Sequence, residues 1–176
     1  MIIKRYTLLI IATLLLVTVS SLFARGVYQS DEDFISEVFL KAPPKNDRIM
    51  LGGEVRKRVT SLLGHPYGGL LVKYWKKEGR TAWILKEIGK TEPITFGIVI
   101  KDNKIEKIKV LEFRESRGWE VKYPAFTKQF YGAGLESDKL TKRIDGISGA
   151  TLSLWAMTGV SRMALYLHQH LSNKPK

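Results

Sequence analysis

Hydrophobic residues near the end of the chain recur at steps of three and four, the period of an amphipathic α-helix. The repeat begins at Thr151 and includes Leu152, Trp155, Ala156, Gly159, Val160, Met163, Ala164, Leu167 and Leu171. It predicts a closing helix with a wide buried face to which these residues belong. We therefore expect this helix to cover the core of the domain.

In the middle of the chain the period changes to two, which indicates β-strands. Two pairs of strand-like stretches occur, 70–76 with 81–87 and 93–100 with 104–113. The linkers 77–80 and 102–103 are short and contain turn-forming residues, so each pair is predicted to be an antiparallel hairpin. The alternation breaks around Lys107, where we expect a β-bulge.

Helices are predicted on both sides of these hairpins. Residues 30–33 resemble a capped, acidic helix start. A second helix is expected over 48–63, with Gly52 and Gly53 weakening its start. A short helix is expected over 124–131, with Pro124 in its first turn. This order predicts an α+β domain, in which helices cover an antiparallel sheet, over residues 70–172, after a helical lead-in over 26–69.

The first 25 residues have the composition of an export signal. An uncharged run from Tyr6 to Ala24 is 19 residues long, and as a helix it would span ~28 Å, close to the ~30 Å hydrocarbon core of a bilayer. The run is longer than a usual signal-peptide core, which favours an uncleaved transmembrane anchor over residues 1–25. Cleavage as a signal peptide remains the alternative, because small residues stand at Ser20 and Ser21.

Charge on the two sides of this run predicts its orientation. Lys4 and Arg5 precede it and Asp31 follows, so the N-terminus is expected in the cytoplasm and the domain outside it. Three of the 29 basic residues lie in 1–25, which leaves 26 against 17 acidic residues, or +9, in the exported part. Export argues against a nucleic-acid partner. We expect this surface to face anionic headgroups or an acidic protein partner, or to be simply solvated.

The residue types that are missing narrow the chemistry. The chain has no cysteine, which excludes iron–sulfur clusters, attached c-type haem and thiol catalysis. Only His65, His168 and His170 are histidines, and their spacing gives no metal pair, so surface or helix-end positions are expected. No catalytic triad or metal site is predicted.

A short motif stands where the closing helix begins. In the segment 145–153, Gly146 and Gly149 permit close approach of a ligand, and Ser148 is expected to cap the helix. Free backbone N–H groups of Gly149, Ala150 and Thr151 would then form an anion site at the helix start. The residues alone favour a simpler reading, in which Ser148 caps the helix, the glycines form the turn before it and no ligand binds.

The same segment resembles the flavinylation motif of the FMN-binding domain family, which is known from flavin subunits of the Rnf complex and the sodium-pumping NADH:quinone reductase. Asp145, Ser148, Gly149, Ala150, Thr151 and Ser153 match the motif. Residues 115–118, Glu-Ser-Arg-Gly, resemble a second family stretch that lies near the flavin. At Arg117 and Trp119 the chain departs from several relatives, which affects the expected pocket shape.

The resemblance implies a covalently bound FMN on Thr151, esterified by a flavin transferase that uses FAD. It implies a bacterial inner-membrane protein whose periplasmic domain relays electrons between a membrane donor and an extracytoplasmic acceptor. The residues expected to bind the cofactor are Thr151, Asp145, Ser148, Gly149, Ala150, Leu152, Ser153, Glu115, Ser116 and Gly118. Small anchored members of the family look most similar to this chain.

Alternatives stay open for the neighbouring side chains and for the function. One ring among Trp119, Tyr123, Phe126, Phe130 and Tyr131 is expected either to stack on the flavin or to pack in the core. Arg114 and Arg117 are expected near the phosphate or in solvent, and Glu115 in the pocket or in a salt bridge. The rival functions are a flavin-dependent reductase of small or ferric substrates and a flavin-free basic binding module.

Overall fold

The structure, a computed structural model, describes residues 26–173. Six antiparallel strands form one sheet in the order β1-β6-β5-β4-β3-β2. The strands are β1 (Gly26–Val27), β2 (Asp47–Met50), β3 (Leu71–Lys77), β4 (Arg80–Ile88), β5 (Pro93–Lys101) and β6 (Lys104–Phe113). The helices are α2 (Asp31–Val38), α3 (Gly53–Leu63), α4 (Pro124–Thr127) and α5 (Thr151–Asn173). Short 3₁₀ turns, η1 (Trp119–Lys122) and η2 (Lys128–Phe130), flank α4, and a small hairpin, β7 (Leu135–Glu136) with β8 (Lys139–Leu140), precedes α5.

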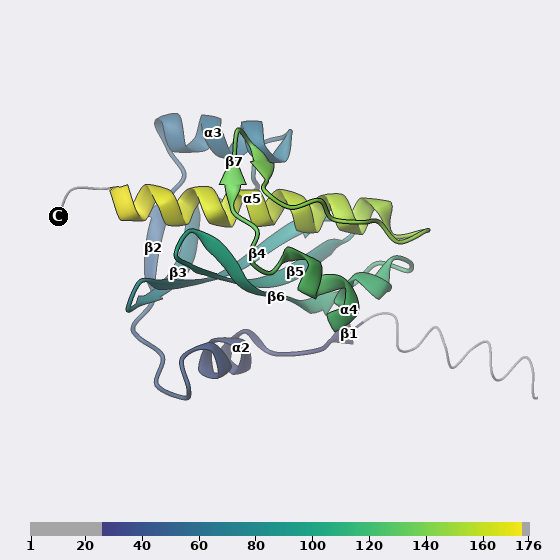
Figure 1. Ribbon diagram of the computed structural model, residues 1–176, viewed down its shortest axis with the longest axis horizontal. Coiled ribbons are helices and arrows are strands. Elements are labelled where there is room, and N and C mark those ends of the chain that lie inside the picture. The colour runs from purple at the N-terminus through teal and green to yellow at the C-terminus, as the bar shows by residue number, and fades with distance from the viewer. Residues whose placement is uncertain (1–25, 174–176) are drawn as a thin grey trace, which may run out of the picture.

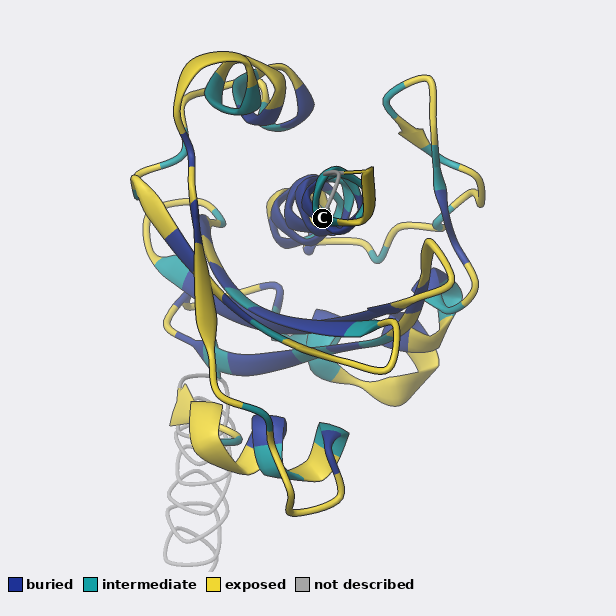
Figure 2. Ribbon diagram, turned by 90° about the vertical axis from the view of Figure 1, so that its left-hand side faces the viewer, coloured by how far each residue is buried: buried dark blue, intermediate teal, exposed yellow. Residues whose placement is uncertain are grey.

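Helix α5 lies along the concave face of the curved sheet, with α3 and the β7–β8 hairpin on either side of it (Figures 1 and 2). This arrangement encloses the larger core, which includes Trp83, Phe96, Met157 and Val160, all fully buried. Each such side chain gains about 1.5–3 kcal/mol from leaving water. The core therefore fixes α5, and with it the position of its first turn.

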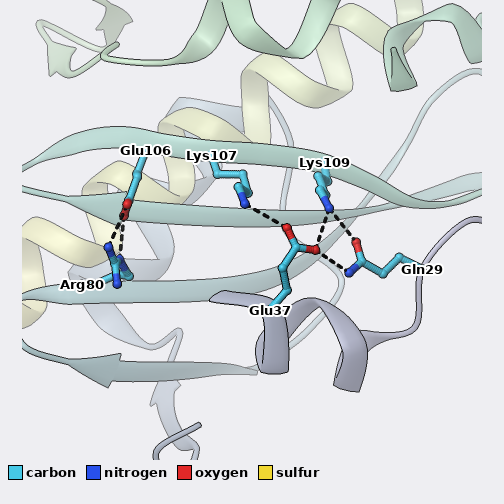
Figure 3. A network of polar contacts seen from close by, with 6 residues as sticks. All are labelled: Gln29, Glu37, Arg80, Glu106, Lys107 and Lys109. Atoms are coloured by element: carbon cyan, nitrogen blue, oxygen red, sulfur yellow. Dashed lines mark hydrogen bonds and ion pairs between the residues drawn. The ribbon is translucent and has the colours of Figure 1, made fainter. Parts of the chain in front are cut away.

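Helix α2 covers the opposite face of the sheet over a second, smaller core. Phe34 packs against Gly97 of β5, where an added Cβ would lie 2.6 Å from the Phe34 ring, so the helix needs a glycine beneath it. Glu37 of α2 accepts hydrogen bonds from Lys107 at 2.9 Å and Lys109 at 2.7 Å (Figure 3). Helix α2 is thus held against the sheet by hydrophobic packing and by the ion pairs of Glu37.

The predicted α+β class, the hairpins and the closing helix are confirmed. The predicted helix over 48–63 is wrong in its first part, because Asp47–Met50 form β2 and pair with β3. The helix begins only at Gly53, with Gly52 as its N-cap. The bulge expected near Lys107 lies at its neighbour: Lys107 pairs with Val99 and Ile105 with Ile100, which leaves Glu106 as the extra residue.

The predicted transmembrane anchor, residues 1–25, lies outside the described residues. Within residues 26–173, none of the helices combines the length and the apolar character that crossing a bilayer requires. Strands from the predicted lead-in, β1 and β2, form the two edges of the sheet. The domain boundaries at residues 25 and 69 stay predictions.

Candidate functional site

The turn between β4 and β5 is held by a single buried carboxylate. Glu115, which is 4% exposed, accepts backbone N–H hydrogen bonds from Lys90, from Thr91 at 2.6 Å and from Glu92 at 2.8 Å. Burial works against the charged carboxylate, but the hydrogen bonds from Glu92, Thr91 and Lys90 outweigh it and lower the pKa of Glu115. The carboxylate of Glu115 therefore binds the backbone of this turn, and the alternative of a salt bridge does not hold.

Three residues further on, Gly118 lies against the first turn of α5. Its φ of +84° is in the left-handed region, and an added Cβ would lie 2.6 Å from Ser153 Oγ and 3.4 Å from Ala150 Cα. Both motif segments singled out in the sequence, 115–118 and 145–153, are thus in contact. The close approach requires the missing Cβ of Gly118, which is the physical role of glycine in this motif.

Helix α5 begins at Thr151, so the residue immediately before it is Ala150. The prediction that Ser148 caps the helix is wrong. Ser148 is exposed and lies in a turn in which Ala150 N–H donates to Ile147 O at 3.0 Å. Gly149 provides that turn with a φ of +84°. The free N–H groups at this helix start belong to Thr151, Leu152 and Ser153, since an α-helix leaves its first N–H groups without partners in the helix.

The predicted cofactor-binding residues differ in exposure. Thr151 is exposed and presents a hydroxyl at the first position of the helix, whereas Ala150 and Ser153 are buried beneath it. Leu152 is 39% exposed, and Ser116 is exposed in the loop before Gly118. A phosphate on Thr151 would therefore lie in solvent above the helix start, where backbone N–H groups and the helix dipole favour negative charge.

Asp145 lies before this turn and is exposed, with its carboxylate 3.2 Å from Arg143 Nε. Its backbone is fixed from another element: Asp145 N–H donates to Gln129 Oε1 at 2.8 Å, and Gln129 Nε2 donates to Asp145 O at 3.4 Å. Sequence reasoning missed Gln129, because one amide in a short helical segment gives no periodic or motif signal. Gln129 positions the loop that leads to Thr151.

The aromatic residues between the two segments mostly pack in the core. Phe126 and Phe130 are buried and contact each other edge to face, with ring centroids 5.9 Å apart. Trp119 and Tyr131 are half-buried against the core, and Tyr123 is 47% exposed. Arg114 pairs with Glu112 at 2.7 Å. The alternative of ordinary core packing therefore holds for Phe126 and Phe130.

Two expectations about side-chain burial are wrong. Trp155, expected on the buried face of the closing helix, is 64% exposed. Thr151 and Leu152 are exposed with it, whereas Ala150 and Ser153 beside them are buried, so only one side of the first turn is covered. His168, expected at a surface or helix end, is buried, and its Nδ1 lies 2.8 Å from Thr81 Oγ1. Burial, followed by the charge of Lys76, lowers the pKa of His168.

Residues 26–173 contain no candidate metal site. No group of three His, Asp or Glu side chains there is arranged to hold a metal ion. A cavity of about 940 Å³ lies on the α2 face of the sheet, lined by Asp31, Lys73, Trp75 and Lys86 among others. None of its lining residues comes after Pro93, so it is separate from the Thr151 site.

Comparison with known proteins gives one match. Residues 89–165 match the family model of the FMN-binding domain. No curated protein and no solved structure matches the chain. The match begins at the turn held by Glu115, includes Gly118 and extends to Leu165, about two thirds of the way along α5. The close approach of Gly118 to Ser153, the exposed Thr151 and the free N–H groups around it fit a flavin phosphate. Residues 89–165 therefore match the FMN-binding domain family, and this match supports FMN as the cofactor.

Proposed function

We propose that this protein is a membrane-anchored electron carrier that holds FMN as a phosphoester on Thr151. FMN supplies reversible one- and two-electron chemistry when bound. The chain's own residues hold it in place: Thr151 provides the ester oxygen, and the first-turn N–H groups of α5 face the phosphate. A covalent bond suits an exported protein, because a cofactor lost by dissociation outside the cytoplasm could not be recovered.

The observation that carries this proposal is the exposed hydroxyl of Thr151 at the first position of α5, within the family match. A flavin transferase must reach this oxygen, so that the bond from Thr151 Oγ to the FMN phosphorus forms while the bond to the AMP part of FAD breaks. Ser153 is buried under the helix and is a poorer acceptor. The neighbouring Ser148 is exposed but lies outside the helix.

The decisive experiment is co-expression with a flavin transferase, followed by denaturation and measurement of intact mass and in-gel flavin fluorescence. We expect the wild type to gain the mass of one FMN residue and the Thr151→Ala variant to gain none. Thr158→Ala is the matched control, since Thr158 lies two turns along the same helix. A wild type without attached flavin, or flavin that persists on Thr151→Ala, would reject the proposal.

We also propose that residues 6–24 anchor the protein in the bacterial inner membrane with the FMN-binding domain outside the cytoplasm. Support comes from the strand β1, which follows this segment in the sequence. Gly26 pairs with Phe113, two residues before Glu115, and Phe113 also pairs with Ile94 beside the turn that Glu115 holds. A membrane donor and an extracytoplasmic acceptor could both approach this end of the domain, which also contains the start of α5 (Figure 1).

This topology can be tested because the chain has no cysteine. A single cysteine introduced as Ser172→Cys, an exposed position near the end of α5, should react in intact spheroplasts with a membrane-impermeant maleimide. Lys4→Cys should react only after the cells are lysed. Labelling in the reverse order would overturn the orientation, and release of the protein into the soluble periplasmic fraction would indicate cleavage.

A further inference from the structure

We propose that Trp155 stacks on the isoalloxazine ring of the FMN attached to Thr151 and so determines where that ring lies. This inference rests on the proposed attachment at Thr151. Trp155 is 64% exposed, an unusual exposure for an indole in a domain whose other three tryptophans are buried or half-buried. It stands four residues after Thr151 on the same helix face, which places the two Cβ atoms about 6 Å apart.

The surroundings of this helix face limit where a tethered ring can lie. On one side the loop before the helix approaches α5, since an added Cβ on Gly146 would contact Leu154 at 3.5 Å. On the other side the end of α3 approaches α5, where an added Cβ on Gly159 would lie 3.2 Å from Leu63. Trp155 stands between these two contacts along α5, one turn after Thr151.

Leu152 adds apolar surface next to the attachment point. It is 39% exposed and precedes Trp155 by three residues, so the two side chains are neighbours on the helix. A flavin ring held by its ribityl chain has an apolar, electron-poor face, for which an indole is the best stacking partner among the side chains. Thr151, Leu152 and Trp155 thus form a surface that suits a tethered flavin.

A second exposed aromatic residue, Tyr123, is already engaged. The Tyr123 ring contacts Trp119 edge to face, with centroids 5.5 Å apart, and has Lys122 Nζ 5.6 Å from its centroid. Trp119 packs against the core beneath α5, on the side of Gly118 and the buried Ser153. Thr151 lies on the exposed side. Tyr123 and Trp119 are therefore not the partners of the ring, and Tyr123 provides a matched control.

Flavin emission reports this contact directly, because an indole stacked on an isoalloxazine quenches its fluorescence by electron transfer. We would load wild type, Trp155→Ala and Tyr123→Ala with FMN, confirm equal attachment by mass, and compare emission per flavin. In Trp155→Ala the emission should rise about sixfold, because a stacked-to-open ratio of about five, which an aromatic pair typically gives, leaves only about one sixth of the flavin unquenched in the wild type. In Tyr123→Ala it should equal that of the wild type.

Each other outcome has a defined meaning. Attached flavin with unchanged emission in Trp155→Ala overturns the stacking while it leaves the proposed function intact. If the flavin emission rises in Tyr123→Ala and not in Trp155→Ala, the stacking residue is Tyr123, and the inference about Trp155 is overturned. A wild type without attached flavin overturns the proposed function and this inference together. Circular dichroism of both variants, which alter exposed side chains, checks that the fold is unchanged.

Discussion

Gly118 and Ser153 approach each other so closely that a single added methyl group on Gly118 would lie 2.6 Å from the Ser153 hydroxyl oxygen. The contact joins the loop after β6 to the first turn of α5 across 35 positions of the sequence. Since Thr151 stands two residues before Ser153, this contact adds to the hydrophobic core in holding the proposed attachment residue in place relative to the sheet.

Gly118→Ala should accordingly destabilise the protein and reduce flavin loading. The left-handed backbone and the clash with Ser153 together should cost about 2–4 kcal/mol of unfolding free energy. Gly149→Ala is the matched control: its φ is the same +84°, but an added Cβ there would meet no atom within 4 Å. It should cost only about 1–2 kcal/mol. Urea denaturation of both variants makes the comparison, and equal losses would show that the close approach contributes nothing.

Replacing Glu115 by Gln should release the turn between β4 and β5. An amide cannot accept the three backbone N–H bonds as a carboxylate does, so we expect a loss of about 2 kcal/mol at neutral pH. Glu92→Gln, an exposed change in the same turn, should have almost no effect. Chemical denaturation of the two variants and the wild type measures both losses.

The effect of Glu115 should also depend on pH. Because the folded pKa of Glu115 is lowered, its stabilisation is complete above the unfolded pKa of about 4.3 and disappears as the pH falls through the folded pKa. The stability difference between wild type and Glu115→Gln should therefore narrow in acid. A difference that stays constant from pH 7 to strongly acid solution would contradict this assignment.

Glu37 should attach α2 to the sheet in a similar, weaker way. The hydrogen bonds from Lys109 and Gln29 lower the pKa of Glu37 to about 2. Its stabilisation is therefore complete above the unfolded pKa of about 4.3, declines below it, and is lost as the pH falls through about 2. The side chains of Glu37, Lys107 and Lys109 are each more than a third exposed. Solvent screening therefore limits the loss of unfolding free energy in Glu37→Gln to about 0.5–1 kcal/mol. Denaturation at low and high salt tests this, with Glu54→Gln on the exposed surface of α3 as the control.

His168 should make the protein less stable in mild acid. Its pKa is lowered in the folded state by burial, so below the unfolded value of about 6.5 the unfolded chain binds the proton more readily. Stability then falls as the pH decreases through this range. His168→Gln should remove that part of the pH dependence, whereas His170→Gln should retain it. Unfolding free energies measured between pH 8 and pH 5 decide the point.

Periodicity predicted the parts of the fold that repeat. The strands of the two hairpins and the 23-residue α5 are long enough to show their period. The edge strands β1 and β2, with two and four residues, are too short to show one, and their pairing depends on distant strands. For this reason Arg48 and its neighbours were predicted as helix.

Prediction of the site was similarly uneven. The motif around Thr151 and the stretch ending at Gly118 can be recognised from their amino acids alone, and the structure brings them into contact. The partners of Glu115 lie 23 to 25 positions earlier, and no local pattern connects them. The exposure of Trp155 depends on which part of α5 the sheet covers, and an amphipathic repeat does not contain that information.

The pairing of Gly26 with Phe113 has a consequence for how far the domain can move. If residues 6–24 span the membrane as we propose, Arg25 alone separates the bilayer from the first strand of the sheet. One residue spans at most about 3.6 Å, so the domain would have no swinging arm with which to carry electrons over a distance. Its redox partners would have to come to the membrane surface, and the rate of exchange would depend on their diffusion and docking, not on the movement of a tethered flavin.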